Sequence, residues 1–398
     1  MKSILLTISI FILSFQISDA QWVKVSNGIG DIIINKLACS GNNVFAGTHS
    51  GVYLSTNNGS SWIYTSMNTY VWPIAINGSY IFVGSYINNG VYLSTNNGTT
   101  WTQTSLNNRS VRSLAINGNN VLAGTYTYGV YLSTNNGATW TQTTLNNQSV
   151  LSLAVNINTV FAGTDGYGVY LSTNNGTSWT QTSLNNRTIW SLAVIGNNIF
   201  AGTDGNGVYL STNNSTSWTQ TSLNNQRVFS LHVNGNNIFA GSSGNGIYVS
   251  NNNGVSWTQR NEGLGNLVVN AFCILNNYIF AGTLYSVYRR PLGELVSIKP
   301  ISNEVPKSYS LFQNYPNPFN PTTKIKFGIP TAGEKHAIDV HIIIYDVSGR
   351  LIETIVNENL KPGIYEVTWN ASKYSSGVYF YKLVSVDYVN AKKMILIK

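Results

Sequence analysis

A phrase that ends in tryptophan recurs along this chain at a constant interval. Six tryptophans are each separated by 39 residues, and five of the six end the phrase S-(T/N)-N-N-G-x-x-W; they are Trp62, Trp101, Trp140, Trp179, Trp218 and Trp257. The remaining copy, which ends at Trp218, has Ser215 in place of the glycine. A second phrase, close to A-G-T, occurs seven times, with glycines at Gly47, Gly84, Gly124, Gly163, Gly202, Gly241 and Gly282. Such a period indicates one small structural unit that packs against copies of itself.

Each unit has the pattern of four short strands. In the third repeat these are Val111–Asn117, Asn120–Thr125, Gly129–Ser133 and Trp140–Thr143, which are alternating or continuously apolar. Thr134-Asn135-Asn136-Gly137 joins the last two strands, and Asn and Gly are the residues that tolerate the positive φ of a hairpin turn. We expect the tryptophan that follows each turn to bury its ring between neighbouring units. Units of four strands at a period near 40 predict an all-β fold, a β-propeller.

The count of strands predicts how the ring closes. Seven inner segments precede only six complete turn-plus-Trp phrases, and the seventh unit ends near Pro291 without an outer strand. Gln21–Val25 resembles the outer strand W-T-Q-T-S and has no unit of its own. We expect this segment to pair into the last unit, which removes two exposed sheet edges. The prediction is a seven-bladed propeller over residues 21–293, with six or eight blades as the alternatives.

The turn phrase resembles the Asp-box (BNR) repeat, S-x-D-x-G-x-x-W, of sialidase-like, sortilin-like and photosystem-assembly-factor-like propellers. The resemblance covers about residues 22–293. Asn replaces the Asp in every copy: Asn57, Asn96, Asn135, Asn174, Asn213 and Asn252. Because Asn keeps the capping role and lacks the charge, we expect these boxes to be structural and to bind no metal.

The composition changes near Ser308, after a predicted linker over residues 294–308. Proline-rich and Gly-Tyr phrases follow: Tyr315–Pro321, Ile344–Arg350, Gly363–Tyr365, Gly377–Tyr379 and Lys392–Lys398. Asp346–Gly349 has the pattern of a hairpin turn, and alternating strands such as Tyr365–Trp369 predict a small Ig-like β-sandwich over residues 309–398. In this order the phrases resemble the type A C-terminal sorting domain of the bacterial type IX secretion system, the Por secretion tail. The resemblance implies that residues 309–398 engage that machinery and that the protein is secreted or attached to the outer cell surface.

The opposite end of the chain and the overall charge agree with export. Residues 1–20 have Lys2, an apolar run and small residues before Gln21, the pattern of a signal peptide. No later segment is long enough and apolar enough to predict a transmembrane segment. The net charge of +8 is spread along the chain without a basic patch, so we expect no nucleic-acid partner.

The positions that differ between repeats predict a ligand-binding face. One variable column, at the start of each inner strand, holds Asn35, Trp72, Arg112, Leu151, Trp190, Phe229 and Asn270. Arg109, Arg187 and Arg227 flank this column, and the loops on the same face add Tyr86, Tyr126, Tyr128, Asp165, Tyr167 and Asp204. Aromatic, Arg and Asp side chains around a channel mouth suit an extracellular glycan or protein ligand, because rings stack on sugars and polar tips orient them. The alternative is that loops with no packing role simply vary between the copies.

Catalysis has few candidate residues. Asp165 and Asp204 occupy equivalent loops of adjacent units, so an inverting glycoside hydrolase on the channel face is the alternative function; a sialidase-like site would need three convergent arginines. A third hypothesis is a self-assembling surface-layer component. The four histidines lack metal-ligand spacing and no phosphate loop occurs, so the sequence predicts no metal and no cofactor. His232 lies on an inner strand and is expected to face the core or the channel.

The two cysteines, Cys39 and Cys273, fall in the first and last units. They are one position apart in the repeat, and neighbouring positions of a strand point to opposite faces. We therefore expect them to remain unpaired as small core residues.

Overall fold

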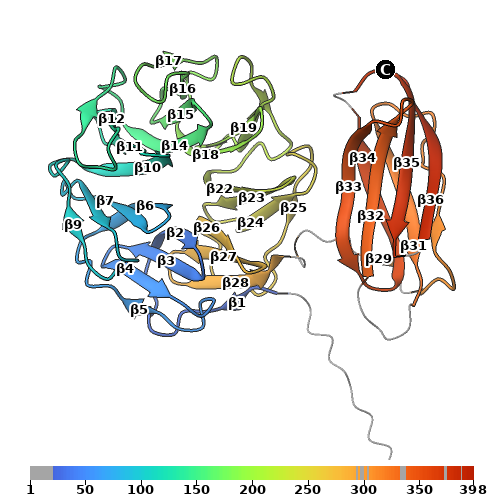
Figure 1. The fold of residues 1–398 in the computed structure, drawn as a ribbon, viewed down its shortest axis with the longest axis horizontal. Coiled ribbons are helices and arrows are strands. Elements are labelled where there is room, and N and C mark those ends of the chain that lie inside the picture. The colour runs from blue at the N-terminus through green and yellow to red at the C-terminus, as the bar shows by residue number, and fades with distance from the viewer. Residues whose placement is uncertain are drawn as a thin grey trace, which may run out of the picture.

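A computed structural model describes residues 21–292, 295, 300–302, 304–331, 338–371, 374–386 and 388–398. The predicted signal peptide lies outside the described residues. Residues 21–291 form seven antiparallel four-stranded sheets around a centre, and a sandwich of two further four-stranded sheets follows (Figure 1).

We number the seven sheets in chain order of their inner strands. Sheets 1 to 4 contain β2 (Ile34–Ser40), β3 (Asn43–Thr48), β4 (Gly51–Ser55) and β5 (Ile63–Tyr64); β6 (Val71–Asn77), β7 (Tyr80–Ser85), β8 (Val91–Ser94) and β9 (Thr102–Gln103); β10 (Val111–Asn117), β11 (Asn120–Thr125), β12 (Val130–Ser133) and β13 (Thr141–Gln142); and β14 (Val150–Asn156), β15 (Thr159–Thr164), β16 (Val169–Ser172) and β17 (Thr180–Gln181). Sheets 5 to 7 contain β18 (Ile189–Ile195), β19 (Asn198–Thr203), β20 (Val208–Ser211) and β21 (Thr219–Gln220); β22 (Val228–Asn234), β23 (Asn237–Ser242), β24 (Ile247–Ser250) and β25 (Thr258–Gln259); and β26 (Val269–Leu275), β27 (Tyr278–Thr283), β28 (Val287–Pro291) and β1 (Val23–Lys24).

The N-terminal strand closes the ring. β1 pairs with β28, with Val23 opposite Arg289 and Lys24 opposite Tyr288, as the strand count predicts. Trp22 is buried beside this pairing and donates from Nε1 to the carbonyl oxygen of Arg260 at 2.8 Å. Sheet 7 is thus built from both ends of the propeller segment, and neither end leaves an unpaired edge.

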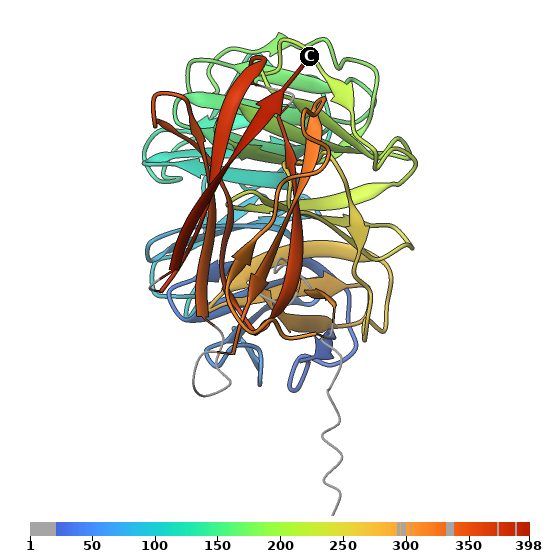
Figure 2. The ribbon, with the colours of Figure 1, turned by 90° about the vertical axis from the view of Figure 1, so that its right-hand side faces the viewer.

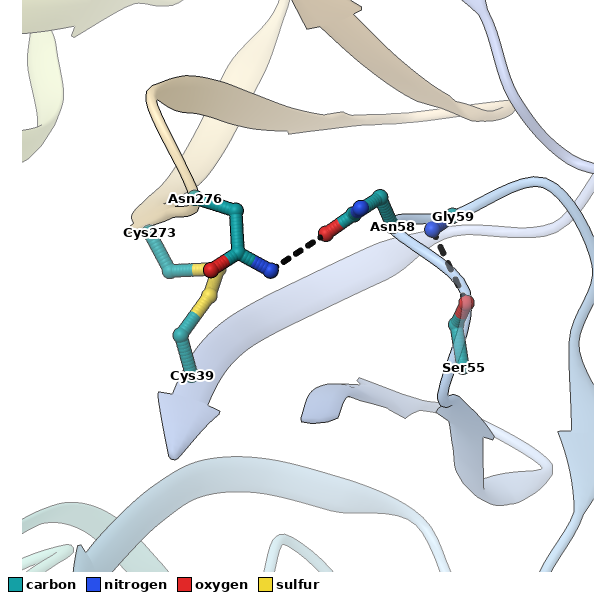
Figure 3. The surroundings of a disulfide bond; sticks show 6 residues. All are labelled: Cys39, Ser55, Asn58, Gly59, Cys273 and Asn276. Carbon is teal, nitrogen blue, oxygen red and sulfur yellow. Dashed lines mark hydrogen bonds between the residues drawn. A yellow bond between two sulfur atoms is a disulfide. The ribbon is translucent and has the colours of Figure 1, made fainter. Parts of the chain in front are cut away.

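The prediction for the cysteines is wrong. Cys39 and Cys273 form a disulfide that joins β2 of sheet 1 to β26 of sheet 7 (Figure 3), with the Cα atoms 5.9 Å apart. The two strands belong to different sheets that stack face to face, so the side chains that meet come from opposite faces. Cys39 and Cys273 are one position apart in the repeat and so lie on opposite faces of their own sheets. In two stacked sheets, these opposite faces are the ones that meet. Nearby, Asn276 Nδ2 donates to Asn58 Oδ1 at 3.0 Å and adds a second link across the same boundary (Figure 3).

The Asn-rich turns repeat one hydrogen-bond pattern six times. In residues 133–137, Ser133 Oγ accepts from the Gly137 N–H at 2.8 Å, and Asn135 Oδ1 accepts from the Thr139 N–H at 2.9 Å. Asn135 Nδ2 also donates to the Thr139 hydroxyl at 2.9 Å. The Asn side chain therefore has a structural role in closing the turn.

The tryptophans after these turns are not equally buried. Trp62 is buried and donates from Nε1 to the Val25 carbonyl at 2.7 Å, whereas Trp101, Trp140, Trp179, Trp218 and Trp257 are half-buried. Each packs against the core of the preceding sheet, as Trp101 does near Phe45 and Trp140 near Phe82. Trp22 takes the same place in sheet 7, near Phe239. The expectation of buried rings is confirmed for Trp62 and is wrong in degree for the other five.

Replacing Ser215 by glycine should stabilise the protein by about 1 kcal/mol. Ser215 is buried with φ at +67°, where the equivalent residues of the other turns are glycines, and an L side chain is disfavoured in this conformation. The greater freedom of glycine in the unfolded chain opposes part of the gain. Urea denaturation of Ser215→Gly and the parent protein measures the difference. Equal or lower stability of Ser215→Gly would show that the turn tolerates serine without cost.

The second unit is a sandwich of sheets ordered β29-β34-β31-β30 and β33-β32-β35-β36; its orange and red strands face the viewer in Figure 2. Its strands are β29 (Pro300–Ser302), β30 (Ser310–Leu311), β31 (Thr322–Ile329), β32 (Ile338–Asp346), β33 (Leu351–Leu360), β34 (Gly363–Asn370), β35 (Gly377–Ser385) and β36 (Tyr388–Leu396). Asp346–Gly349 forms the expected turn, with the Gly349 N–H donating to the Asp346 carbonyl. β29 lies inside the predicted linker, so this sheet begins before residue 309.

The proline-rich phrase at the start of the sandwich packs against its last strand. Phe319 is buried, its N–H donates to the Ile395 carbonyl, and its carbonyl accepts from the Ile397 N–H. Asn314 is also buried, with its N–H bonded to the Tyr381 hydroxyl and its side-chain amide to Thr323. The proline-rich phrase and the last strand of the sandwich therefore pack as one structural unit. This contact explains why both carry distinctive sequence phrases.

Candidate functional site

The variable column of the sequence is the bulge position of every inner strand. The register of each inner strand shifts around its second residue, as between Val111 and Ser113 in β10 and between Ile189 and Ser191 in β18. A bulged residue is not paired in the ladder, and its side chain is directed differently from its neighbours. The seven bulge residues are Asn35, Trp72, Arg112, Leu151, Trp190, Phe229 and Asn270, and all seven line a central channel of about 680 Å³.

Two of the seven bulge residues hold the ring together. Asn35 Nδ2 donates to the Val71 carbonyl of sheet 2 at 2.8 Å, and Asn270 Nδ2 donates to the Ile34 carbonyl of sheet 1 at 3.1 Å. In sheets 3 to 6 the serine after the bulge makes the equivalent bond, for example Ser113 to Val150 at 3.1 Å. The bulge side chains of sheets 2 to 6 have no such structural bond in the described chain, so they can contact a ligand.

Sheets 2 and 3 contribute an aromatic cluster at the channel mouth. The Trp72 and Tyr86 ring centres are 5.2 Å apart, and Tyr70 stacks on Tyr86 at 4.7 Å. The Arg112 guanidinium lies 3.6 Å from the Tyr86 ring centre and 5.0 Å from that of Tyr126. Burial, followed by repulsion from Tyr86, raises the pKa of Tyr70, so its hydroxyl stays protonated at neutral pH. We call Tyr70, Trp72, Tyr86, Arg112 and Tyr126 the aromatic cluster.

A second group lies on sheets 5 and 6. The Trp190 and Phe229 rings meet edge to face with centres 5.4 Å apart. Arg227, which also lines the channel, forms an ion pair with Asp204. Trp190 Nε1 and, across the channel mouth, Arg112 Nε are buried donors with no hydrogen-bond partner among the described residues. Such donors are uncommon in folded proteins.

The other predicted site residues lie away from the channel lining. Arg109 lies over the Tyr128 ring at 4.2 Å and donates from Nε to the Tyr131 hydroxyl. Asp165 accepts a hydrogen bond from the Thr188 hydroxyl at 2.9 Å, and Arg187 donates to the Asn186 carbonyl. Tyr126, Tyr128 and Tyr167 are about half exposed at the rim. Of the predicted set, Trp72, Arg112, Trp190, Arg227 and Phe229 line the channel, and Tyr86 and Tyr126 reach it through contacts with Arg112.

The structure adds two channel residues that the sequence analysis missed, Tyr70 and Lys36. At both positions the residue type departs from that of most other repeats. Tyr70 occupies a position where three other repeats have a small hydroxyl residue, and Lys36 a position where four others have serine. His232, expected to face the core or the channel, lines the channel. The described residues contain no group of three or more His, Cys, Asp or Glu side chains placed to hold a metal ion.

The C-terminal unit matches a known family. Residues 313–398 match the family model described as a secretion system C-terminal sorting domain. Proteins with this tail are exported by the type IX secretion system. No helix in the described part of the chain has the length and apolar content needed to cross a bilayer. No curated protein matches the sequence.

Solved structures of propellers resemble the fold at low sequence identity. YCF48 from Cyanidioschyzon merolae has a TM-score of 0.57 and 15% identity, over 69% of this chain and 99% of that one. PorZ, a surface component of the type IX secretion system of Porphyromonas gingivalis, has a TM-score of 0.55 and 16% identity, over 94% of this chain and 60% of that one. A GH74 enzyme of Niastella koreensis has a TM-score of 0.56 and 17% identity, over 77% of this chain and 59% of that one.

These findings define the class of protein. The chain is a β-propeller protein with a sorting domain at its C-terminus. It is exported by the type IX secretion system and is extracellular or anchored at the cell surface.

Proposed function

We propose that this protein is an extracellular recognition module whose channel mouth binds a glycan or a protein ligand, in an adhesive or scaffolding role. The observation that carries the proposal is the placement of the variable side chains. Five successive sheets present Trp72, Arg112, Leu151, Trp190 and Phe229 at the unpaired bulge position, and all five line one channel. Repeats that are otherwise nearly identical thus differ where a ligand would touch them.

A glycan is the ligand that this mouth suits best. Rings at two places on the wall, Trp72 with Tyr86 and Trp190 with Phe229, offer apolar surfaces on which sugar rings stack. The Arg112 guanidinium lies beside the first pair of rings and would bond to sugar hydroxyls. Such sites combine apolar walls with a few polar groups that fix orientation.

Replacing Trp72 and Trp190 together by alanine should weaken glycan binding by about thirtyfold or more, since buried aromatic anchors dominate most binding sites. A glycan array identifies the oligosaccharide that the parent protein binds, and calorimetry then compares the two proteins. Tyr64→Ala is the matched control, because Tyr64 is an exposed aromatic residue on the outer strand β5, away from the channel. Unchanged affinity of the double variant would reject this face as the binding site.

The surface-layer hypothesis gives a different result in the same experiment. It predicts that the parent protein self-associates and shows no selectivity on glycan and peptide arrays. That outcome would overturn the proposed recognition role.

A polysaccharide hydrolase is the alternative function, with Asp165 and Asp204 as its carboxylates. Neither residue is part of the described channel lining, Asp204 is paired with Arg227, and Asp165 accepts a bond from Thr188. We therefore propose binding without hydrolysis. Release of reducing ends from surface polysaccharides that disappears in Asp165→Asn and Asp204→Asn would instead support the enzyme.

A further inference from the structure

The channel wall carries positive and no negative side chains. Its described lining includes Lys36, Arg112, Arg227 and His232, and no Asp or Glu. Arg112 lies over Tyr86 at the mouth, and Arg227 is already paired with Asp204. Among the residues that the structure describes, no carboxylate forms an ion pair with Lys36. Lys36 and Arg112 are therefore the two cations of the described wall that no described carboxylate pairs with, and of these Arg112 is covered by aromatic rings.

Lys36 is also free of the structural role that its position has elsewhere in the ring. In sheets 3 to 6 this position is Ser113, Ser152, Ser191 and Ser230, and each hydroxyl donates to a carbonyl of the next sheet. In sheet 1 the Asn35 side chain makes that bond instead. Because Asn35 holds the sheet boundary, a long cationic side chain at position 36 costs no inter-sheet hydrogen bond.

Resting on the proposed function, we propose that the glycan is acidic and that Lys36 receives its carboxylate inside the channel. The aromatic cluster and the Trp190–Phe229 pair would hold neighbouring sugar rings at the mouth. A uronic-acid unit combines the two chemistries, a sugar ring face and one negative charge on one residue. Charge pairing in a partly enclosed channel is stronger than at an open surface, because water screens it less.

The charges next to Lys36 favour a single negative group at that position. Burial, followed by repulsion from Lys36, lowers the pKa of His232 to about 4, so this imidazole is neutral at pH 7. Lys36 has accessible surface that faces the channel, and desolvation by the surrounding wall lowers its pKa from the ordinary value of 10.5, which an anion beside the ammonium would raise again. One ammonium group matches one carboxylate, whereas a phosphate monoester carries about 1.5 to 2 negative charges.

The test uses two oligosaccharides that differ only in charge: a tetramer of galacturonic acid and the same tetramer after reduction of its carboxyl groups. Calorimetry with the full chain at pH 7 should show about tenfold tighter binding of the acid form. Lys36→Gln should lose this preference and keep its affinity for the reduced form, while Lys36→Arg should retain the preference. Lys24→Gln is the control, since it removes one positive charge from an exposed lysine paired with Asp31 on the outer strand β1.

Three results would overturn the inference. Equal binding of the two tetramers would show that Lys36 does not bind a carboxylate. A preference of Lys36→Gln for the acid tetramer would show the same. If either of these results is found while Trp72→Ala/Trp190→Ala still loses binding of the reduced form, the glycan-binding function stands and only the acidic preference fails. If neither tetramer binds and no other acidic or neutral glycan does, both proposals fail together.

Discussion

Removing the disulfide should lower the free energy of unfolding by about 4 kcal/mol, the largest effect that we expect from a pair of small substitutions. Cys39 and Cys273 are 234 residues apart, so their bond closes a loop that includes most of the propeller segment. A cross-link over so long a loop strongly restricts the unfolded chain, while the loss of two sulfur atoms leaves only a small cavity. Cys39→Ala/Cys273→Ala therefore acts mainly through the unfolded state.

Denaturation with and without a reducing agent checks this expectation. The parent protein should unfold at lower urea concentration when reduced, and Cys39→Ala/Cys273→Ala should behave the same in both conditions. If reduction leaves the parent curve in place, or if the double variant matches the oxidised parent, the cross-link does not contribute as the loop length implies. Sheet 7 should still form in the variant, since the β1–β28 pairing closes the ring independently.

The course of the strands was predictable because the sequence repeats. Turn residues with positive φ, such as Asn136 and Gly137, mark the same hairpin in each unit, and the unmatched segment around Trp22 indicates where the last sheet obtains its outer strand. These features depend on local pattern and on counting. The local pattern and the count can both be obtained from a single sequence, without knowledge of how the sheets stack.

Contacts between sheets were harder to predict. Alternation tells which face of its own sheet a residue occupies, but not which face of the next sheet it meets, and the cysteines were misjudged for this reason. The same limit applies to Trp62, whose ring is buried at the closure while Trp101, which ends the same phrase, is half-buried. Burial depends on the neighbouring sheet and on the segment that covers the ring, and for Trp62 that segment is Val25 from the chain start.

The candidate site was predictable in part. Variable positions identified Trp72, Arg112 and Trp190, because packing does not constrain a bulged residue. Lys36 was missed because its neighbour Asn35 makes the inter-sheet bond that serine makes in other sheets, and this reason for tolerating a lysine is known only from the structure. A search for positions where one repeat departs from a small hydroxyl residue would find both Lys36 and Tyr70.

Replacing Trp62 by alanine should destabilise the protein by about 3 to 5 kcal/mol, the usual cost of removing a buried tryptophan. The ring is 4% exposed, it packs in one cluster with Phe280 of sheet 7, and its Nε1 bonds to the Val25 carbonyl. The substitution therefore leaves a cavity at the boundary where the ring closes and removes a partner of the N-terminal segment.

Trp101→Ala is the matched comparison, because Trp101 ends the same phrase with its glycine, packs near Phe45 and is half-buried, with no hydrogen-bond partner for Nε1 in the described residues. Loss of this ring should cost about 1 to 2 kcal/mol. The substitution removes less buried apolar area than Trp62→Ala does, and no buried carbonyl loses its donor. Urea denaturation of the two variants measures the difference. Equal destabilisation would mean that each tryptophan contributes through its own turn alone, and that the closure between sheets 7 and 1 adds no stability at Trp62.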